Sequence, residues 1–264
     1  GLASAAKKQS RVAAEGQVGA VVKGKHAALV EINCETDFAS KSPDFTSFAT
    51  ATANAAVAGS FTTVDALLGA KLPSGLTVKD TISELTIKIG EKIDVRRLTT
   101  MTLDGNGVIG SYVHSGKIGV ICKITSDKDV SGNADVQELA KDLCMQVAAA
   151  NPTFINGSDI DETFKNREAE IYAVQLREQG KSEQMIPNIV KGKLNKLASE
   201  VCLVEQSFVK NPDVTIAKQV ADVGTKAGAK LTVAAFTKFN LGEGIEKKED
   251  NFAEEVAKMT GVKN

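Results

Sequence analysis

The sequence predicts an α+β fold of two related hairpin-plus-helix units, with an antiparallel helical (coiled-coil) hairpin inserted and a helix at the C-terminal end. The first observation behind this prediction is a repeat. Gly19 corresponds to Gly110, 91 residues further on, and Val30 corresponds to Cys122, 92 residues further on, so the second hairpin has one added residue. A repeat of this length indicates two duplicated subdomains and not a solenoid, the alternative being a chance likeness of two hairpin-helix units. The second observation is a pair of adjoining amphipathic segments after Pro152.

In the first unit, alternating Val and Ala residues around a Lys-Gly-Lys turn predict a β-hairpin over 16–34. Ser42 is expected to cap the following helix, in which Phe45 and Phe48 share one face. The other elements expected here are a helix over 2–14, helices over 43–58 and 78–89, and a strand over 93–103.

The second unit repeats this order. We expect a hairpin over 107–124, a helix over 133–150, a helix over 214–227 and a strand over 230–240. Helices over 161–179 and 183–199, joined by a short polar turn, predict a helical hairpin that projects from the body as an arm. Pro187 is tolerable only in the first turn of its helix. A last helix over 249–259 carries Phe252, Val256 and Met259 on one face, which needs the protein's core or a partner to cover it.

These elements divide the chain into five parts. The boundaries that we expect are a linker helix (1–14), core subdomain N (15–106), core subdomain C (107–158 and 203–241), the helical hairpin (159–202) and a C-terminal module (242–264).

Composition excludes several classes of protein. The 264 residues carry 32 basic and 33 acidic side chains, a balance that argues against binding a nucleic-acid backbone as the main activity. The four cysteines are scattered without a CxxC pair or neighbouring histidines, so we expect buried, reduced thiols and no zinc site. We see no signal peptide and no membrane-spanning run. Because the chain begins at Gly1 without Met, we expect a processed form or a fragment.

No constellation of residues predicts catalysis. Residues 19–25 fit GxxxxGK, but the final Ser or Thr is replaced by His26, and strands rather than a helix are expected on both sides. His26 and His114 are the only histidines, and both are expected in hairpin turns. We therefore predict a binding protein that is not an enzyme and has no cofactor or metal site.

The stretch 33–41 is the most informative part of the chain. Asp37 and Phe38 adjoin where a predicted strand ends, which allows two interpretations. Phe38 is either a core plug with Asp37 as a helix cap, or the pair is a wedge presented to a partner protein. The corresponding stretch of the second unit, 125–129, has acidic residues but no aromatic one, which favours the wedge, since a plug needed by both units should recur.

Five segments together resemble the elongation factor Ts family in order and sequence. They are residues 31–38 with Lys41, Asp44 and Phe45, and residues 89–97, 110–114, 239–246 and 252–257. The resemblance implies a guanine nucleotide exchange factor that binds elongation factor Tu, GDP-bound or nucleotide-free, during translation elongation. It also implies two related core subdomains, an inserted coiled-coil arm and a C-terminal helical module.

The same resemblance assigns the site residues. Asp37 and Phe38 are expected to enter the GTPase domain of Tu near its magnesium site. The C-terminal helix is expected to dock on that domain, and the second subdomain to face another domain of Tu. The implied partner-binding residues are Thr36, Asp37, Phe38, His114, Phe252, Val256 and Met259.

Two departures from the family pattern and one alternative remain. Members normally begin with a three-helix domain, and none precedes Gly1, so we expect that it was removed or that this is an organellar or processed form. A His common in the helix before residues 151–152 is Gln146 here, which puts the role of that imidazole in doubt.

The alternative function is an RNA-binding translation accessory protein. The expected location is the cytoplasm if the source is bacterial, and otherwise the plastid stroma or mitochondrial matrix; no DNA, membrane or direct nucleotide binding is expected.

Overall fold

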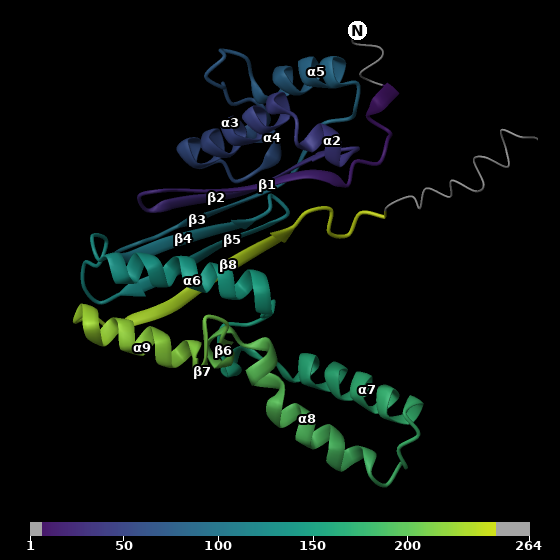
Figure 1. Cartoon of the computed structure of the whole chain (residues 1–264), viewed down its shortest axis with the longest axis vertical. Helices are drawn as coiled ribbons and strands as arrows, with labels where there is room; N and C mark the ends of the chain where they lie inside the picture. Colours follow the sequence, from purple (N-terminus) through teal and green to yellow (C-terminus); the bar gives the residue numbers. More distant parts are fainter. Residues whose placement is uncertain (1–6, 247–264) are drawn as a thin grey trace, which may run out of the picture.

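The computed structural model describes residues 7–246, which form a mixed α+β structure with three antiparallel sheets and eight α-helices (Figure 1). The strands are β1 (Glu15–Lys23), β2 (His26–Cys34), β3 (Asp94–Thr102), β4 (Asn106–His114), β5 (Ile118–Ser126), β6 (Ser207–Phe208), β7 (Asn211–Thr215) and β8 (Leu231–Asn240). The helices are α2 (Asp37–Ser40), α3 (Pro43–Gly59), α4 (Val64–Leu68), α5 (Val78–Ile89), α6 (Ala134–Ala150), α7 (Glu162–Glu178), α8 (Ile186–Val201) and α9 (Ile216–Ala227), with short 3₁₀ turns at Gly157–Asp159 and Leu203–Glu205.

Two three-stranded sheets stack face to face at the centre of the body (Figure 1). The first sheet has the order β1-β2-β3 and the second β4-β5-β8. Helix α3 packs on β1 and β2, while α6 packs on β4 and β5, so the helices cover the outer faces. Buried residues from both sheets, including Leu29 and Ile121, form the core between them. The sheets approach closely at Gly119, where a Cβ would lie 2.5 Å from Val18.

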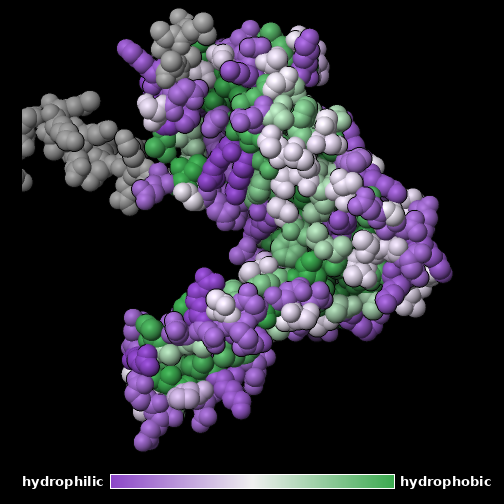
Figure 2. Space-filling model, turned by 180° about the vertical axis from the view of Figure 1, so that it is seen from behind, coloured by the Kyte–Doolittle hydropathy of each residue, from purple (hydrophilic) through white to green (hydrophobic). Residues whose placement is uncertain are grey.

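Helices α7 and α8 form an antiparallel pair that projects from the second unit (Figure 1). From behind, the molecule is hollowed between this arm and the first unit (Figure 2). The pair is joined to the body by a short parallel bridge between Phe154 and Cys202. Pro187 lies in the first turn of α8, as predicted, because only there is its missing N–H harmless. The structure thus has an antiparallel helix pair in the part of the chain where the sequence predicts one, although α8 begins at Ile186 and not at residue 183.

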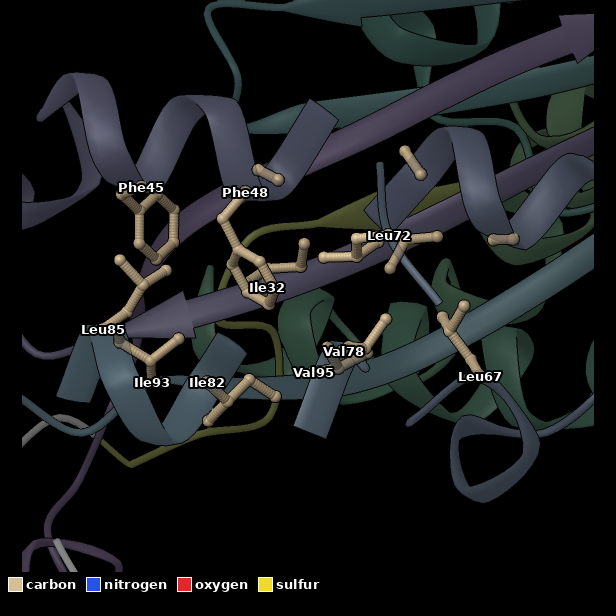
Figure 3. Packing of buried hydrophobic residues seen from close by; sticks show 14 of the residues in the cluster. Ile32, Phe45, Phe48, Leu67, Leu72, Val78, Ile82, Leu85, Ile93 and Val95 are labelled. Atoms are coloured by element: carbon tan, nitrogen blue, oxygen red, sulfur yellow. The ribbon is translucent and has the colours of Figure 1, made fainter. Parts of the chain in front are cut away.

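The core of the first unit is built from residues whose spacing the sequence already displays. Ser42 caps α3 by accepting a hydrogen bond from the N–H of Phe45, which fixes the start of the helix. Phe45 and Phe48 then point from α3 towards Ile32 on β2, and residues from α5 close the other side (Figure 3). The side chain of Phe45 is completely buried.

The two large sheets share their irregularities. The second residue of the first strand in each sheet is a glycine with positive φ, Gly16 (138°) in β1 and Gly107 (146°) in β4, where a Cβ would lie 2.0 Å from the carbonyl oxygen of Ile32 or Ile124. Both have a register shift in the central strand immediately before that Ile. The extra residue of the second hairpin lies in its turn, since Lys23 pairs with His26 whereas His114 pairs with Ile118.

This likeness provides an internally controlled prediction. A Cβ at Gly110 would lie 2.5 Å from backbone atoms of Ala140, whereas at Gly19 it would meet only the Ala53 side chain, at 3.1 Å. Gly110→Ala should therefore lower the free energy of unfolding by about 1–3 kcal/mol, because helix α6 must move. Gly19→Ala should change the free energy of unfolding by less than about 1 kcal/mol. The lower conformational entropy of the unfolded variant offsets the cost of the close contact with Ala53. Urea unfolding of both variants checks this, and equal losses would contradict it.

Some predicted elements need correction. The helix expected over 2–14 extends no further than Lys8 among the described residues, because residues 9–14 turn and then run extended into β1. The strand pair β6–β7 and the short helices α2 and α4 were not predicted. The predicted helix over 249–259 lies outside the described residues.

Candidate partner-binding site

Strand β2 runs directly into the one-turn helix α2, which carries Asp37 and Phe38. Thr36 is the N-cap, and its Oγ1 accepts a hydrogen bond from the N–H of Ala39 at 3.2 Å. Phe38 is 85% exposed, more than any other large apolar side chain in the described part of the chain. The interpretation of Phe38 as a core plug and Asp37 as a cap is therefore wrong, because Thr36 and Ser42 are the caps.

The carboxylate of Glu91 holds the backbone before α2. Its Oε2 accepts the N–H groups of Glu35 and Thr36, each at 3.0 Å, and its Oε1 accepts the Thr36 hydroxyl at 2.6 Å. The carboxylate of Glu35 in turn accepts the N–H of Lys92 at 2.6 Å. These reciprocal hydrogen bonds to charged acceptors are stronger than bonds between neutral groups. They fix the backbone at residues 35–36, immediately before Phe38, and this bonded segment is called the platform below.

Asp37 is exposed and paired with a lysine of its own helix. Lys41 Nζ lies 3.0 Å from its Oδ2, an (i, i+4) pair, and this hydrogen bond and charge lower the pKa of Asp37. Lys117, in the β4–β5 turn of the second unit, lowers that pKa further. A cleft between α2 and this turn is lined by Gly16, Gln17, Asp37, Ser40, Lys41, Ser115, Gly116 and Lys117.

His114 ends β4, immediately before that turn. Its Nδ1 lies 3.0 Å from the Tyr112 hydroxyl. The turn is fixed to the first unit by a 2.8 Å hydrogen bond from the N–H of Val18 to the carbonyl of Gly116. The structure thus brings the turn after His114 close to Asp37. His114 itself lines a separate, mainly apolar groove with Tyr112, Ile118, Met145, Ala148, Ala149 and Val209.

The remaining predicted features have structural roles. Gly24, in the GxxxxGK-like stretch, has φ 58° in the turn between β1 and β2, so the stretch does not run into a helix. All four cysteines are buried and free, and burial raises the pKa of Cys34 to about 12. Gln146 is buried and binds backbone groups of Ser207 and Val209, a structural role for the position where a His is common.

Two residues of this site were not identified from the sequence. Glu91 lies in one of the segments that carry the family resemblance, but nothing in its spacing places it against Thr36. Lys117 belongs to the other unit, and only the stacking of the sheets brings it near Asp37. Phe252, Val256 and Met259 lie outside the described residues.

The described residues contain no cluster of metal-ligating side chains, and no helix among them is long and apolar enough to span a bilayer. An exposed aromatic side chain beside a hydrogen-bonded backbone is a geometry suited to contact with another protein. A family model described as elongation factor TS matches residues 35–243. The chain belongs to the elongation factor Ts family, the non-catalytic nucleotide-exchange factors for elongation factor Tu, and the predicted function and partner are confirmed.

Similar proteins named elongation factor Ts occur in clostridia. That of Clostridium botulinum (strain Eklund 17B / Type B) is 44% identical over 264 residues, covering 99% of this chain and 86% of the relative. The proteins of Clostridium perfringens (strain 13 / Type A) and Clostridium acetobutylicum are 43% and 44% identical, with the same or nearly the same coverage. These relatives are bacterial; the expectation about the N-terminal three-helix domain stays a prediction.

Proposed function

We propose that this chain releases GDP from elongation factor Tu by inserting Phe38 into the GTPase domain near its magnesium site. Asp37 enters beside it and disturbs the surroundings of the magnesium ion. The observation that carries this proposal is the exposure of Phe38 on a platform fixed by Glu91. An exposed apolar side chain on a fixed backbone loses less conformational entropy when a partner buries it than one on a mobile loop.

Differential binding accounts for exchange without a catalytic residue. A factor that binds nucleotide-free Tu more tightly than the GDP complex must weaken GDP binding by the same factor. A tenfold effect requires about 1.4 kcal/mol, and burying one Phe supplies about 1.5–3 kcal/mol. Phe38 therefore contributes materially, and further contacts supply the rest.

Those contacts come from other parts of the chain. The C-terminal segment bearing Phe252, Val256 and Met259 docks on the same GTPase domain, while His114 and the second unit face another domain of Tu. The departure of the chain after β8 on the side of the molecule where α2 lies supports the first of these contacts (Figure 1). The apolar groove beside His114 supports the second.

The two units are core subdomains N and C and arose by duplication. The support is their shared strand order, paired glycines and matching register shifts. Helices α7 and α8 form the coiled-coil arm, and residues after 241 the C-terminal module. The bacterial origin of the similar proteins supports a cytoplasmic location.

Stopped-flow release of labelled GDP from Tu tests the proposed function. Adding the chain should accelerate release in proportion to its concentration until the complex saturates. Release at the spontaneous rate, with a chain shown to be folded by circular dichroism, would overturn it. An RNA-binding accessory role would instead appear as salt-dependent RNA affinity without faster release.

Glu91→Gln should slow stimulated release about tenfold, because charge-assisted bonds to two backbone N–H groups and a hydroxyl are weakened and Phe38 is less well positioned. The same stopped-flow assay measures this. Glu84→Gln, on the exposed side of α5, is the matched control and should release GDP at the wild-type rate. Full activity of Glu91→Gln would contradict the role given to the platform.

A further inference from the structure

The buried carboxylate of Glu31 lies where the first unit meets the chain that leaves the second. Its side chain is fully buried. Oε1 accepts the N–H of Gly242 at 2.8 Å and the side-chain amide of Asn33 at 3.1 Å. Arg96 binds both oxygens at 3.2 and 3.3 Å, and Arg97 Nε binds Oε2. A buried charge with this many hydrogen-bond donors is compensated. Glu31, Arg96 and Arg97 therefore form a fixed connection, called the joint below, between the first unit and the chain that follows β8.

A β-bulge makes this arrangement possible. Val30 pairs with Leu98 and Glu31 with Arg97, but Ile32 pairs with Val95, which leaves Arg96 as the extra residue. In a regular strand, successive side chains point to opposite faces of the sheet. At a bulge two residues oppose one on the partner strand, so both arginines reach Glu31.

The same arginines hold the residues that follow β8. Arg97 donates to the carbonyl of Asn240 at 2.8 Å and lies 4.1 Å above the ring of Phe239. Arg96 donates to the carbonyl of Glu243. Gly242 has φ 72°, and a Cβ there would lie 2.6 Å from the carbonyl oxygen of Ala14. The start of the C-terminal segment is thus held at residues 239–243 by hydrogen bonds and close contacts with the first unit and with Ala14.

The second unit shows that the fold does not require these charges. Its central strand has the same register shift, and Lys123 stands where the first unit has Glu31. The residues on the opposing strand are Ala234 and Ala235. The bulge is therefore common to both units, while the glutamate and two arginines belong to the first alone.

We propose that Glu31, Arg96 and Arg97 are positioning residues for exchange, fixing the direction in which the C-terminal segment leaves the body relative to α2. Strand β2 carries Glu31 and leads directly to Thr36 and Phe38, so one strand sets both contact elements. This inference rests on the proposed docking of α2 and the C-terminal segment on one domain of Tu. Once one element has docked, a fixed joint raises the effective concentration of the other.

A double-mutant cycle in the 264-residue chain tests the joint, with stimulated GDP release as the readout. Arg97→Gln should slow release about two- to thirtyfold, the range of 0.5–2 kcal/mol typical of coupling changes. In a Phe252→Ala background the same substitution should slow release much less, because the segment to be positioned no longer binds. Gly242→Ala should behave like Arg97→Gln without removing a charge. Lys218→Ala, which breaks an exposed pair on α9, is the control and should have no effect.

The outcomes separate the inference from the proposed function. Equal slowing by Arg97→Gln with and without Phe252 would overturn the joint, because a general structural defect acts in both backgrounds. Wild-type release by Phe252→Ala would overturn the docking of the C-terminal segment, and the joint with it. Thermal unfolding followed by circular dichroism checks that each variant is folded. If Arg97→Gln does not fold, Gly242→Ala takes its place in the double-mutant cycle.

Discussion

Phe38→Ala is expected to slow stimulated GDP release by about ten- to a hundredfold while leaving the melting temperature unchanged. The slowing follows from the loss of about 1.5–3 kcal/mol of binding free energy, which the Phe38 side chain contributes only when Tu buries it. The unchanged stability follows because Phe38 is 85% exposed and contributes nothing to a core. Stopped-flow release and circular dichroism measure the two quantities.

A matched control separates the role of Phe38 from general loss of surface apolarity. Ile87 on α5 is 50% exposed and lies outside every proposed contact. Ile87→Ala should therefore release GDP at the wild-type rate. Stimulated GDP release at the wild-type rate by a folded Phe38→Ala variant would contradict the assignment of Phe38 as a wedge.

Glu31→Gln is expected to lower the free energy of unfolding by about 3 kcal/mol at neutral pH. Removing one partner of a buried ion pair leaves the charges of Arg96 and Arg97 without their buried counterion. The exposed pair between Glu162 and Lys165 provides the control, and Glu162→Gln should cost less than about 1 kcal/mol. Urea unfolding measures both.

Acidification should reduce this difference. Burial alone raises the pKa of Glu31, but the hydrogen bonds from Gly242, Asn33 and Arg97 and the charge of Arg97 outweigh it, so the pKa falls below its usual value of 4.5. The stabilisation by a carboxylate of lowered pKa is complete above the unfolded-state pKa and lost as pH falls through the folded one. The gap between wild type and Glu31→Gln should thus be constant down to about pH 4.5 and shrink below it. A gap that widens on acidification would contradict this assignment.

Long regular elements were predictable because their signals are local. The hairpins follow from alternation around Gly-Lys turns, and α3 follows from its cap at Ser42 and its apolar face. Helix α2 has four residues and strand β6 two, too few to show a period. Residues 9–14 have a composition compatible with a helix, but the turn at 9–11 and the entry into β1 override it.

The site was predictable only in part for the same reason. Phe38 is visible in the sequence as an aromatic residue at a strand end, and its absence from the second unit already favours a role outside the core. Its support by Glu91 depends on a contact between residues 55 positions apart. The joint at Glu31 depends on a β-bulge between β2 and β3, and no residue pattern in these strands predicts that bulge.

The central claim is that Phe38 contributes more to the binding of nucleotide-free Tu than to the binding of the GDP complex. Titration calorimetry of the wild type and Phe38→Ala against both forms of Tu tests it most directly. The ratio of the two dissociation constants should fall at least about tenfold in the variant, mainly through weaker binding to nucleotide-free Tu. A Phe38→Ala variant that loses affinity equally for both forms would show that Phe38 anchors the complex without driving exchange.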